Sequence, residues 1–469
     1  MPAEHKHELL DPIDAISPLD GRYHDITEVL SPYASEAALI RTRTEVEALY
    51  LIALSDEGII RPLENDERQA LSTLGQSLSD KQVRDIKKIE ATTKHDVKAV
   101  ERGIWGFLQG STMEDLTSYV HIALTSEDVN NLAYRLMAQR AKDQVCVPLL
   151  DGITDKLVAM AEESKDLVMI ARTHGQPAVP TTLGKELINY AYRLNQQVRA
   201  LAAFRLTGKL NGAVGNYNAH RFVFPNIDWE GFSTKFVEGL GLRPNLVTTQ
   251  INAYEDFIEM FQSFMRINGI IIDFDQDTWR YISDAWFGQE VVKGEVGSST
   301  MPHKVNPIKF ENSEGNALLA NGIFGAMAQA LGQSRLDRDL RDSTIVRNVG
   351  SAFGYSILAY HNPLGGLSRV KPHKDNIHKA LHENWVVLTE GVQVLLRTRG
   401  VQDPYSIISE LTRGAVIDEQ AWREWIEGLP AEIDDETRQL LAGMTPETYI
   451  GDAIELTDYA IEQIKASRN

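Results

Sequence analysis

The chain has 469 residues, a formal net charge of −19, and 43% hydrophobic and 24% charged residues. This composition is ordinary for a globular protein with a large core, and the length predicts two to four domains at roughly 100–200 residues each. The acidic balance argues against non-specific nucleic-acid binding, which needs a basic face. It leaves open a small anionic ligand held by a local group of Arg and Lys.

Cysteine content and hydropathy narrow the class further. The single cysteine, Cys146, excludes an intrachain disulfide, and we expect it to be a small buried side chain. The chain has no run of 18 apolar residues, so no membrane span is expected. Its start lacks the apolar core of a secretory signal. Together these features predict a cytoplasmic enzyme or scaffold.

The first part of the chain should be irregular and then helical. Residues 1–35 are rich in Pro, Asp, Gly and Ser, whereas helical patterns run from about Ala37 to about Ile89. Behind the segment LTSEDVNN (124–131), apolar residues fall on one face of another helix. Ser126 suits the N-cap of that helix, and Pro148 should kink it or mark its end.

The middle of the chain predicts longer helices. They run from about 183 to 204 and from about 247 to 287, and two more begin near 308 and 351. A helix of about 40 residues would be about 60 Å long. Long helices with apolar faces on more than one side belong in a multi-helix bundle, here one shared between subunits. Strand signals are weak, and VMIART (168–173) is too short to imply a sheet.

These patterns predict a mostly α-helical protein of more than one domain. We expect an N-terminal helical domain over 1–122, a central long-helix bundle over 123–368 and a small C-terminal helical domain over 369–469. The last of these shows no evident site.

The segment GSSTMPHKVNP (297–307) carries the strongest chemical signal. Its prolines and glycines keep it out of a regular helix, although it lies between two long helical stretches. A polar segment of this kind suits a loop that closes over a substrate. Ser298 would be an acid–base group, with Lys304 beside it to hold developing negative charge. The alternative is a surface loop rich in turn residues.

Two segments offer histidines. In ARTHGQPAVPTTLGKE (171–186), His174 lies in a predicted loop just before a helix that Thr181 or Thr182 can cap. Imidazole titrates near neutrality, so His174 suits general-acid work, although this segment taken alone favours a structural histidine. The triple Lys94-His95-Asp96 places a cation, an imidazole and a carboxylate in a row, which is weak evidence when taken alone.

Other segments suit anions. LTSEDVNN places two hydroxyls at a helix start, where backbone N–H groups favour an anion, although a simple cap explains them too. SRLDRDLRDSTIVRN (334–348) spaces arginines by three or four, which predicts one basic helical face for phosphate. The alternative is a solvated face with paired aspartates. NGAVGNYNAH (211–220) predicts a tight turn between helices where backbone approaches a ligand.

Several sites are not expected. The chain has no HExxH motif and no paired cysteines, so no metal site is predicted near these motifs, and no cofactor is expected. GSSTM lacks the strand–turn–helix setting of a hydrolase nucleophile.

Together the segments resemble a known family. LTSEDVNN, HGQPAVPTTLGKE and GSSTMPHKVNP occur in the order and at about the spacing of the fumarase/aspartase superfamily. SPLDGRYHD, TTKHDVKAVE, KLNGAVGNYNAH, MPHKVNPIKFENSEGN and RDLRDST resemble its branch that acts on succinylated purine nucleotides. The resemblance covers nearly the whole chain. It implies a mostly α-helical subunit of three domains with a fumarase/aspartase-like fold. It also implies a homotetramer whose central helices form one long bundle and whose active sites are each built from three subunits.

The reaction that the resemblance implies is β-elimination of fumarate, from adenylosuccinate to give AMP and from SAICAR to give AICAR. Ser298 would take the proton next to a succinyl carboxylate, while Lys304 and Asn306 stabilise the charge that builds there. His174 would protonate the leaving nitrogen, and Glu311 would orient His174. Because elimination needs one acid and one base, the roles of His174 and Ser298 could also be exchanged.

The resemblance also implies the residues that bind the substrate. His95 would assist catalysis near the succinyl group, where Thr125, Ser126 and Gln250 would also bind. The phosphate would be held by Arg22, Tyr23, Arg338, Ser343 and Arg347, and the nucleotide by Lys94 and Asp96. Asn312 lies where relatives can carry an arginine, and its role stays open. The alternatives are another lyase of the superfamily, for argininosuccinate, and a non-catalytic helical tetramer.

Overall fold

A computed structural model describes residues 11–290, 301, 304–412 and 417–468. The fold is mostly α-helical, and the strands of the described residues form three two-stranded sheets. The chain divides into two compact units. Unit 1 comprises Met1–Leu149, Ala200–Gly269 and Gly315–His361, and unit 2 comprises Leu150–Arg199, Ile270–Glu314 and Asn362–Asn469. The three-domain division stays a prediction.

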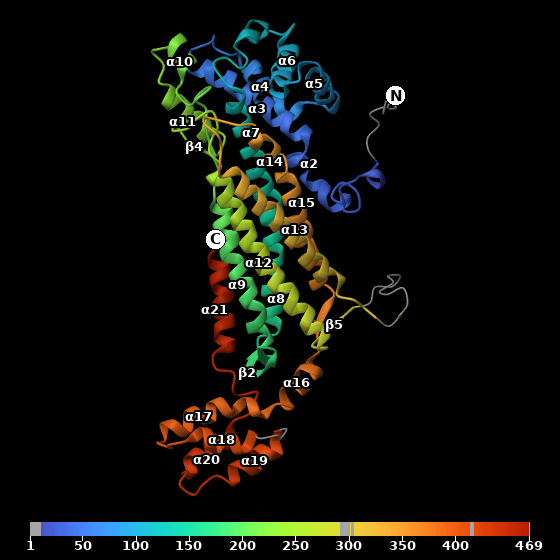
Figure 1. Ribbon diagram of the computed structural model, residues 1–469, viewed down its shortest axis with the longest axis vertical. Helices are drawn as coiled ribbons and strands as arrows, with labels where there is room; N and C mark the ends of the chain where they lie inside the picture. Colours follow the sequence, from blue (N-terminus) through green and yellow to red (C-terminus); the bar gives the residue numbers. More distant parts are fainter. Residues whose placement is uncertain (1–10, 291–300, 302–303, 413–416, 469) are drawn as a thin grey trace. The chain divides into compact units, whose positions relative to one another are not determined.

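Unit 1 is built from helices and one short parallel sheet (Figure 1). Its own elements are α1 (His24–Thr27), α2 (Ser31–Ala34), α3 (Glu36–Asp56), α4 (Asn65–Ser77), α5 (Asp80–Thr93), α6 (Asp96–Leu108), α7 (Ser126–Ala141), β3 (Thr207–Gly208), α10 (Asn218–Val223), α11 (Trp229–Gly239), β4 (Arg243–Pro244) and α14 (Arg341–Val346).

Five longer helices contribute residues to both units: α8 (Val147–Glu163), α9 (Leu183–Ala203), α12 (Glu255–Ser283), α13 (Ile308–Leu331) and α15 (Val349–Leu367). The elements wholly in unit 2 are β1 (Val168–Thr173), β2 (Gln176–Thr182), β5 (Phe287–Gln289), β6 (Val370–Pro372), α16 (Lys374–His382), α17 (Thr389–Thr398), α18 (Pro404–Thr412), α19 (Glu419–Glu427), α20 (Asp435–Gly443) and α21 (Ala453–Ala466).

Aromatic and aliphatic packing forms the core of unit 1. The ring of Phe264 lies 5.4 Å from that of Phe324 and 5.2 Å from that of Phe353, measured between centroids. These three residues come from α12, α13 and α15, so one buried cluster joins three helices. Helix α3 packs against α4 and α7, and it is buried over most of its length because apolar residues occur on all its sides.

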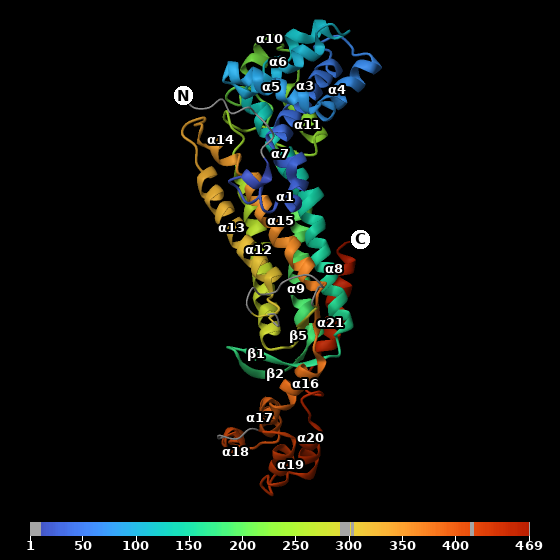
Figure 2. The ribbon, with the colours of Figure 1, turned by 90° about the vertical axis from the view of Figure 1, so that its right-hand side faces the viewer.

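A hairpin in unit 2 corrects the expectation that no sheet forms near 168–173. β1 and β2 pair antiparallel, with Thr173 opposite Gln176 (Figure 2). His174 and Gly175 form the two-residue turn, with φ of 54° and 74°, which is the geometry of the tight turns that match strand twist. The prolines of β2 hide its strand signal. Thr182 Oγ1 accepts the N–H of Lys185 at 3.1 Å, so the predicted cap of α9 is confirmed.

Several helix boundaries differ from the predicted ones. Helix α12 begins at Glu255, not near 247, because the preceding segment is held in an irregular path by side-chain bonds. Thr125 is the N-cap of α7, and Ser126 is its first residue. A π-helical turn at Lys142–Cys146 separates α7 from α8, next to Pro148 as expected. No described helix is both long and apolar enough to cross a membrane.

Candidate active site

A polar cavity of about 810 Å³ lies in unit 1. Its walls come from the junction of α5 and α6, the start of α7, the segment before α12, and residues 338–348. The predicted site residues among its lining are Lys94, His95, Asp96, Thr125, Ser126, Gln250, Arg338, Ser343 and Arg347. Segments that are far apart in the sequence are therefore brought around one space.

Local capping positions the imidazole of His95 in this cavity. Lys94 ends α5 with φ of 51°, and His95 is the N-cap of α6, where its Nδ1 accepts the N–H of Lys98 at 3.1 Å. A neutral imidazole that accepts at Nδ1 carries its proton on Nε2. That Nε2 lies 3.5 Å from Ser126 Oγ, so His95 can donate a hydrogen bond to a ligand beside the start of α7.

Asp96 is held by two arginines. Arg43 Nη2 lies 2.7 Å and Arg347 Nη2 3.3 Å from Asp96 Oδ2. Burial by itself would raise the pKa of Asp96, but the charges of Arg43 and Arg347 outweigh it and the pKa lies below its usual value. The side chain of Arg347 is 48% exposed, so Arg347 can exchange Asp96 for an anionic ligand, whereas the buried Arg43 keeps Asp96 ionised.

Arg338 is paired with a carboxylate that the sequence did not single out. Its Nη2 lies 3.0 Å from Glu127 Oε2 and donates to Ser343 Oγ at 3.2 Å. Burial raises the pKa of Glu127 to about 7, although the charge of Arg338 acts in the opposite direction. Nothing in the local sequence signals that Glu127 is buried, because the residues that cover it come from distant segments.

The charges around the cavity balance. Its lining carries four basic side chains, Arg43, Lys94, Arg338 and Arg347, and four carboxylates, Glu90, Asp96, Glu127 and Asp342. A phosphate or carboxylate ligand must therefore displace protein carboxylates from the arginines. Protonation of Glu127 would leave a net positive charge.

Residues 334–348 do not form the predicted basic helical face and agree instead with the alternative, in which aspartates pair with the arginines. Helix α14 begins only at Arg341, and Arg335 and Arg338 lie in the turns before it. The side chain of Arg338 is 13% exposed, whereas that of Arg335 is 83% exposed. Asp339 approaches Arg335 and Arg341 at 4.0 and 3.9 Å. Of the four arginines in this segment, Arg338 and Arg347 line the cavity.

The turn at 211–220 braces the segment that carries Gln250. Lys209 Nζ donates to the carbonyls of Gly212 and Gln250 at 2.9 and 3.0 Å, and it pairs with buried Asp128. Gly215 has φ of 80°, and a Cβ there would lie 2.2 Å from Thr248 O. The close backbone approach predicted for a ligand is thus made to Thr248 of the same chain, and the turn follows β3 instead of a helix.

Arg22 and Tyr23 do not line the large cavity. The guanidinium of Arg22 lies 6.0 Å from the ring centroid of Tyr23. Their neighbours Asp20 and His24 line a smaller cavity of about 300 Å³, which Arg347 also borders. A phosphate role for these two residues stays a prediction.

The remaining predicted residues belong to unit 2. His174 is exposed at the hairpin turn and makes no hydrogen bond or ion pair with any residue that the structure describes. Glu311 lies in the first turn of α13 and accepts the indole N–H of Trp279 at 3.2 Å. Lys304 is exposed, and Asn306 and Asn312 lie before and within α13. Ser298 lies outside the described residues.

Comparison with known proteins identifies the family. The family model described as lyase matches residues 21–322, and the one described as adenylosuccinate lyase C-terminal matches residues 334–450. The adenylosuccinate lyase of Vibrio cholerae is 43% identical, with 96% of this chain and 99% of that protein covered. That of Dictyostelium discoideum is 42% identical, over 94% and 97%.

Solved structures share the fold. A fumarate lyase from Mesorhizobium sp. BNC1 superposes with a TM-score of 0.75 at 16% identity, covering 93% of this chain and 97% of that one. The 3-carboxy-cis,cis-muconate lactonizing enzyme of Pseudomonas putida gives 0.74 at 19% identity, over 94% and 98%. The chain therefore belongs to the lyase family and, within it, to the adenylosuccinate lyases.

Proposed function

We propose that this lyase eliminates fumarate from adenylosuccinate, giving AMP, and from SAICAR, giving AICAR, in purine nucleotide biosynthesis. The observation that carries the proposal is the convergence of nine predicted substrate-binding residues around one cavity of about 810 Å³. That volume lies within the ordinary range for small-molecule sites. Family membership supplies the reaction type, and the polar lining suits a ligand with two carboxylates and a phosphate.

The binding step exchanges one set of ion pairs for another. The substrate phosphate would pair with Arg347, whose side chain is half exposed, and with Arg338 next to Ser343. Lys94, also exposed, would bind the nucleotide together with Asp96. The succinyl group would lie between His95 Nε2 and the start of α7, where Thr125, Ser126 and Gln250 supply polar contacts. Arg22 and Tyr23 would complete the phosphate site.

The chemical step needs one base and one acid. Ser298 Oγ would remove the proton from the carbon next to a succinyl carboxylate, and the charge that develops on this carboxylate would be stabilised by Lys304 and Asn306. The C–N bond then breaks, fumarate forms, and His174 gives a proton to the departing nitrogen. Glu311 would orient His174, and Asn312 would contact the substrate.

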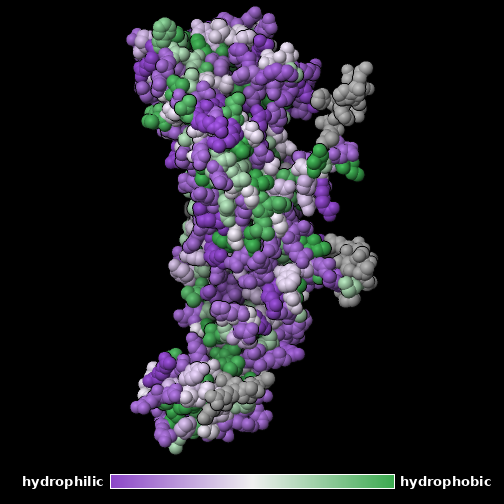
Figure 3. Space-filling model, in the orientation of Figure 1, coloured by the Kyte–Doolittle hydropathy of each residue, from purple (hydrophilic) through white to green (hydrophobic). Residues whose placement is uncertain are grey.

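An exposed apolar stripe supports the proposed homotetramer. On the unit 1 part of α13, Leu318 and Leu319 are 55% and 53% exposed, and a Cβ at Gly315 or Gly322 would meet no atom within 4 Å. Figure 3 shows green residues gathered over the helices that include α13. Apolar stripes of this kind are usually covered by a partner, and the helical surface would fit a second copy of the chain. The same proposal holds that each active site is built from three subunits and that the protein is cytoplasmic.

The assay of the reaction uses purified protein and the ultraviolet change as adenylosuccinate becomes AMP. We expect turnover with adenylosuccinate and SAICAR and none with argininosuccinate. Turnover of argininosuccinate alone would assign another lyase activity. No turnover of any succinyl substrate would favour a structural tetramer.

The proposed roles are tested by two variants. Ser298→Ala should keep the fold and lose roughly 10²- to 10⁴-fold in kcat, the range for a lost acid–base group, and His174→Ala should do the same. Because different subunits would supply the two groups, mixing the inactive variants should restore part of the activity. Near wild-type turnover by Ser298→Ala, or no restored activity in verified mixed tetramers, would refute these assignments.

The tetramer is tested by its mass. Leu318→Glu together with Leu319→Glu should lower the mass measured by light scattering, whereas Leu440→Glu, an exposed leucine on α20, should leave it unchanged. A wild-type protein that is monomeric would overturn the assembly.

A further inference from the structure

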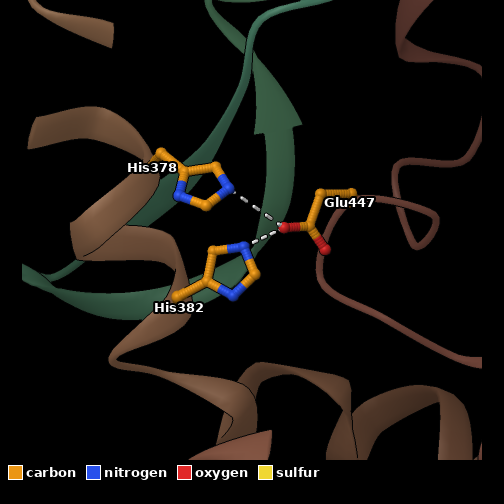
Figure 4. Close-up of side chains that lie close together, drawn as sticks. All are labelled: His378, His382 and Glu447. Carbon is orange, nitrogen blue, oxygen red and sulfur yellow. Dashed lines mark ion pairs between the residues drawn. The ribbon is translucent and has the colours of Figure 1, made fainter. Parts of the chain in front are cut away.

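Two histidines and a glutamate meet in unit 2, and neither the reaction nor the substrate uses them. His378 and His382 lie on α16, with ring centroids 4.1 Å apart. Their Nε2 atoms both face Glu447 Oε1 (Figure 4), at 3.7 Å for His378 and in close contact for His382. The possible ligand atoms all lie within 4.8 Å of one another.

Both sides of this cluster are held in place by local structure. Residues i and i+4 share one face of a helix, and α16 is anchored by its buried residues Ile377 and Leu381. Glu447 belongs to a turn in which Thr445 N–H donates to Thr448 Oγ1 at 3.0 Å and Tyr449 N–H donates to the carbonyl of Thr445 at 3.1 Å. A ligand would therefore require little rearrangement of the backbone.

We propose that His378, His382 and Glu447 bind one divalent transition-metal ion of the zinc class. Two imidazole nitrogens and one carboxylate oxygen are the donor set that such ions prefer, whereas Mg²⁺ and Ca²⁺ require mostly oxygen ligands. His382 Nε2 is buried and makes no hydrogen bond of acceptable geometry. The side chain of His378 is 65% exposed, which leaves a fourth position open to water.

The ion would act as a structural latch. Helix α16 contacts β1 of the hairpin that carries His174, and Asn376 Nδ2 donates to the carbonyl of Ala285 at 2.8 Å. The ion would tie the turn around Glu447 to a helix that supports the hairpin and the approach to β5. The pattern H-x₃-H at 378–382 is the sequence signal for this cluster, but Glu447 could be added only from the structure.

The test is a Co²⁺ titration of untagged, chelator-treated, full-length protein, followed by visible absorption. We expect one Co²⁺ per chain, displaced by Zn²⁺. His378→Ala and Glu447→Gln should each weaken Co²⁺ binding about 100-fold or more. Loss of a residue that only hydrogen-bonds to a metal ligand costs up to about 100-fold in affinity, and loss of a ligand itself should cost at least as much. His373→Ala is the matched control, since His373 is an exposed histidine at the start of α16 outside the cluster. Unchanged binding by His378→Ala, or no binding by the wild type, would overturn the site.

Hydrogen exchange tests the latch. Zn²⁺ should slow amide exchange in α16 and in 445–449 for the wild type and His373→Ala, and should leave exchange unchanged in His378→Ala. Metal-free melting curves check that the variants fold. Because His378 is mostly exposed, its replacement should preserve the fold even if that of His382 does not. Bound Zn²⁺ without slower exchange would refute the latch.

Discussion

Replacing Glu127 by glutamine should change how the stability of the protein depends on pH. Burial raises the pKa of Glu127 from 4.5 to about 7 in the folded protein. The folded state therefore binds more protons than the unfolded state between these values, and the free energy of unfolding falls as the pH rises from about 4.5 to about 7. At 1.36 kcal/mol per pH unit, the pKa difference corresponds to about 3 kcal/mol.

Thermal unfolding at fixed protein concentration between pH 5 and pH 8 measures this effect. The entropy of unfolding is about 2.1 cal/mol/K per residue. For 469 residues, a change of 1 kcal/mol in the free energy of unfolding therefore shifts the melting temperature by about 1 °C. The melting temperature of Glu127→Gln should therefore gain up to about 3 °C on that of the wild type across the range. The side-chain carbonyl of glutamine can still accept a hydrogen bond from Arg338, so the guanidinium keeps a partner in the variant.

Glu67→Gln is the matched control. Hydrogen bonds from Arg61 lower the pKa of Glu67 to about 2, so its contribution is complete above the unfolded value of 4.5 and is lost only as the pH falls below it. This variant should melt lower than the wild type by a constant amount from pH 5 to pH 8. Parallel melting curves for the wild type and Glu127→Gln would refute the raised pKa of Glu127.

Three further substitutions or reactions test the frame of the site. Arg135→Met should cost about 3–5 kcal/mol in urea unfolding because it leaves Asp256, bonded to Arg135 at 3.0 Å from two nitrogens, as a buried unpaired charge; a cost below about 1 kcal/mol would contradict this. Gly215→Ala should lower stability more than Gly58→Ala, since both have positive φ but only Gly215 abuts backbone; equal melting temperatures would refute the clash. Burial raises the pKa of the Cys146 thiol to about 12, so a disulfide reagent should modify it only after unfolding, and rapid modification of the native protein would count against this.

Local patterns in the sequence predicted much of the helical framework. The starts of α9 at Leu183 and α13 at Ile308 agree with prediction because periodicity and capping are properties of neighbouring residues. The candidate residues of the large cavity were instead implied by the resemblance to the fumarase/aspartase superfamily, because no local pattern shows that segments so far apart in the sequence meet. The glycine and prolines near His174 predicted a loop just before a helix. The structure instead has a hairpin turn at His174, followed by strand β2, which contains two prolines.

Burial and ion pairing were decided by the tertiary structure alone. The sequence placed Arg338 on a basic face, but in the structure Arg338 pairs with Glu127 from a distant helix. Glu127 is buried there, and this burial raises its pKa. Likewise, the sequence determined that His378 and His382 share a helix face, whereas the arrival of Glu447 depended on the fold. The physical reason is the same in each case: helix spacing is set within a few residues, while the surroundings of a charge are set by whichever distant segments pack against it.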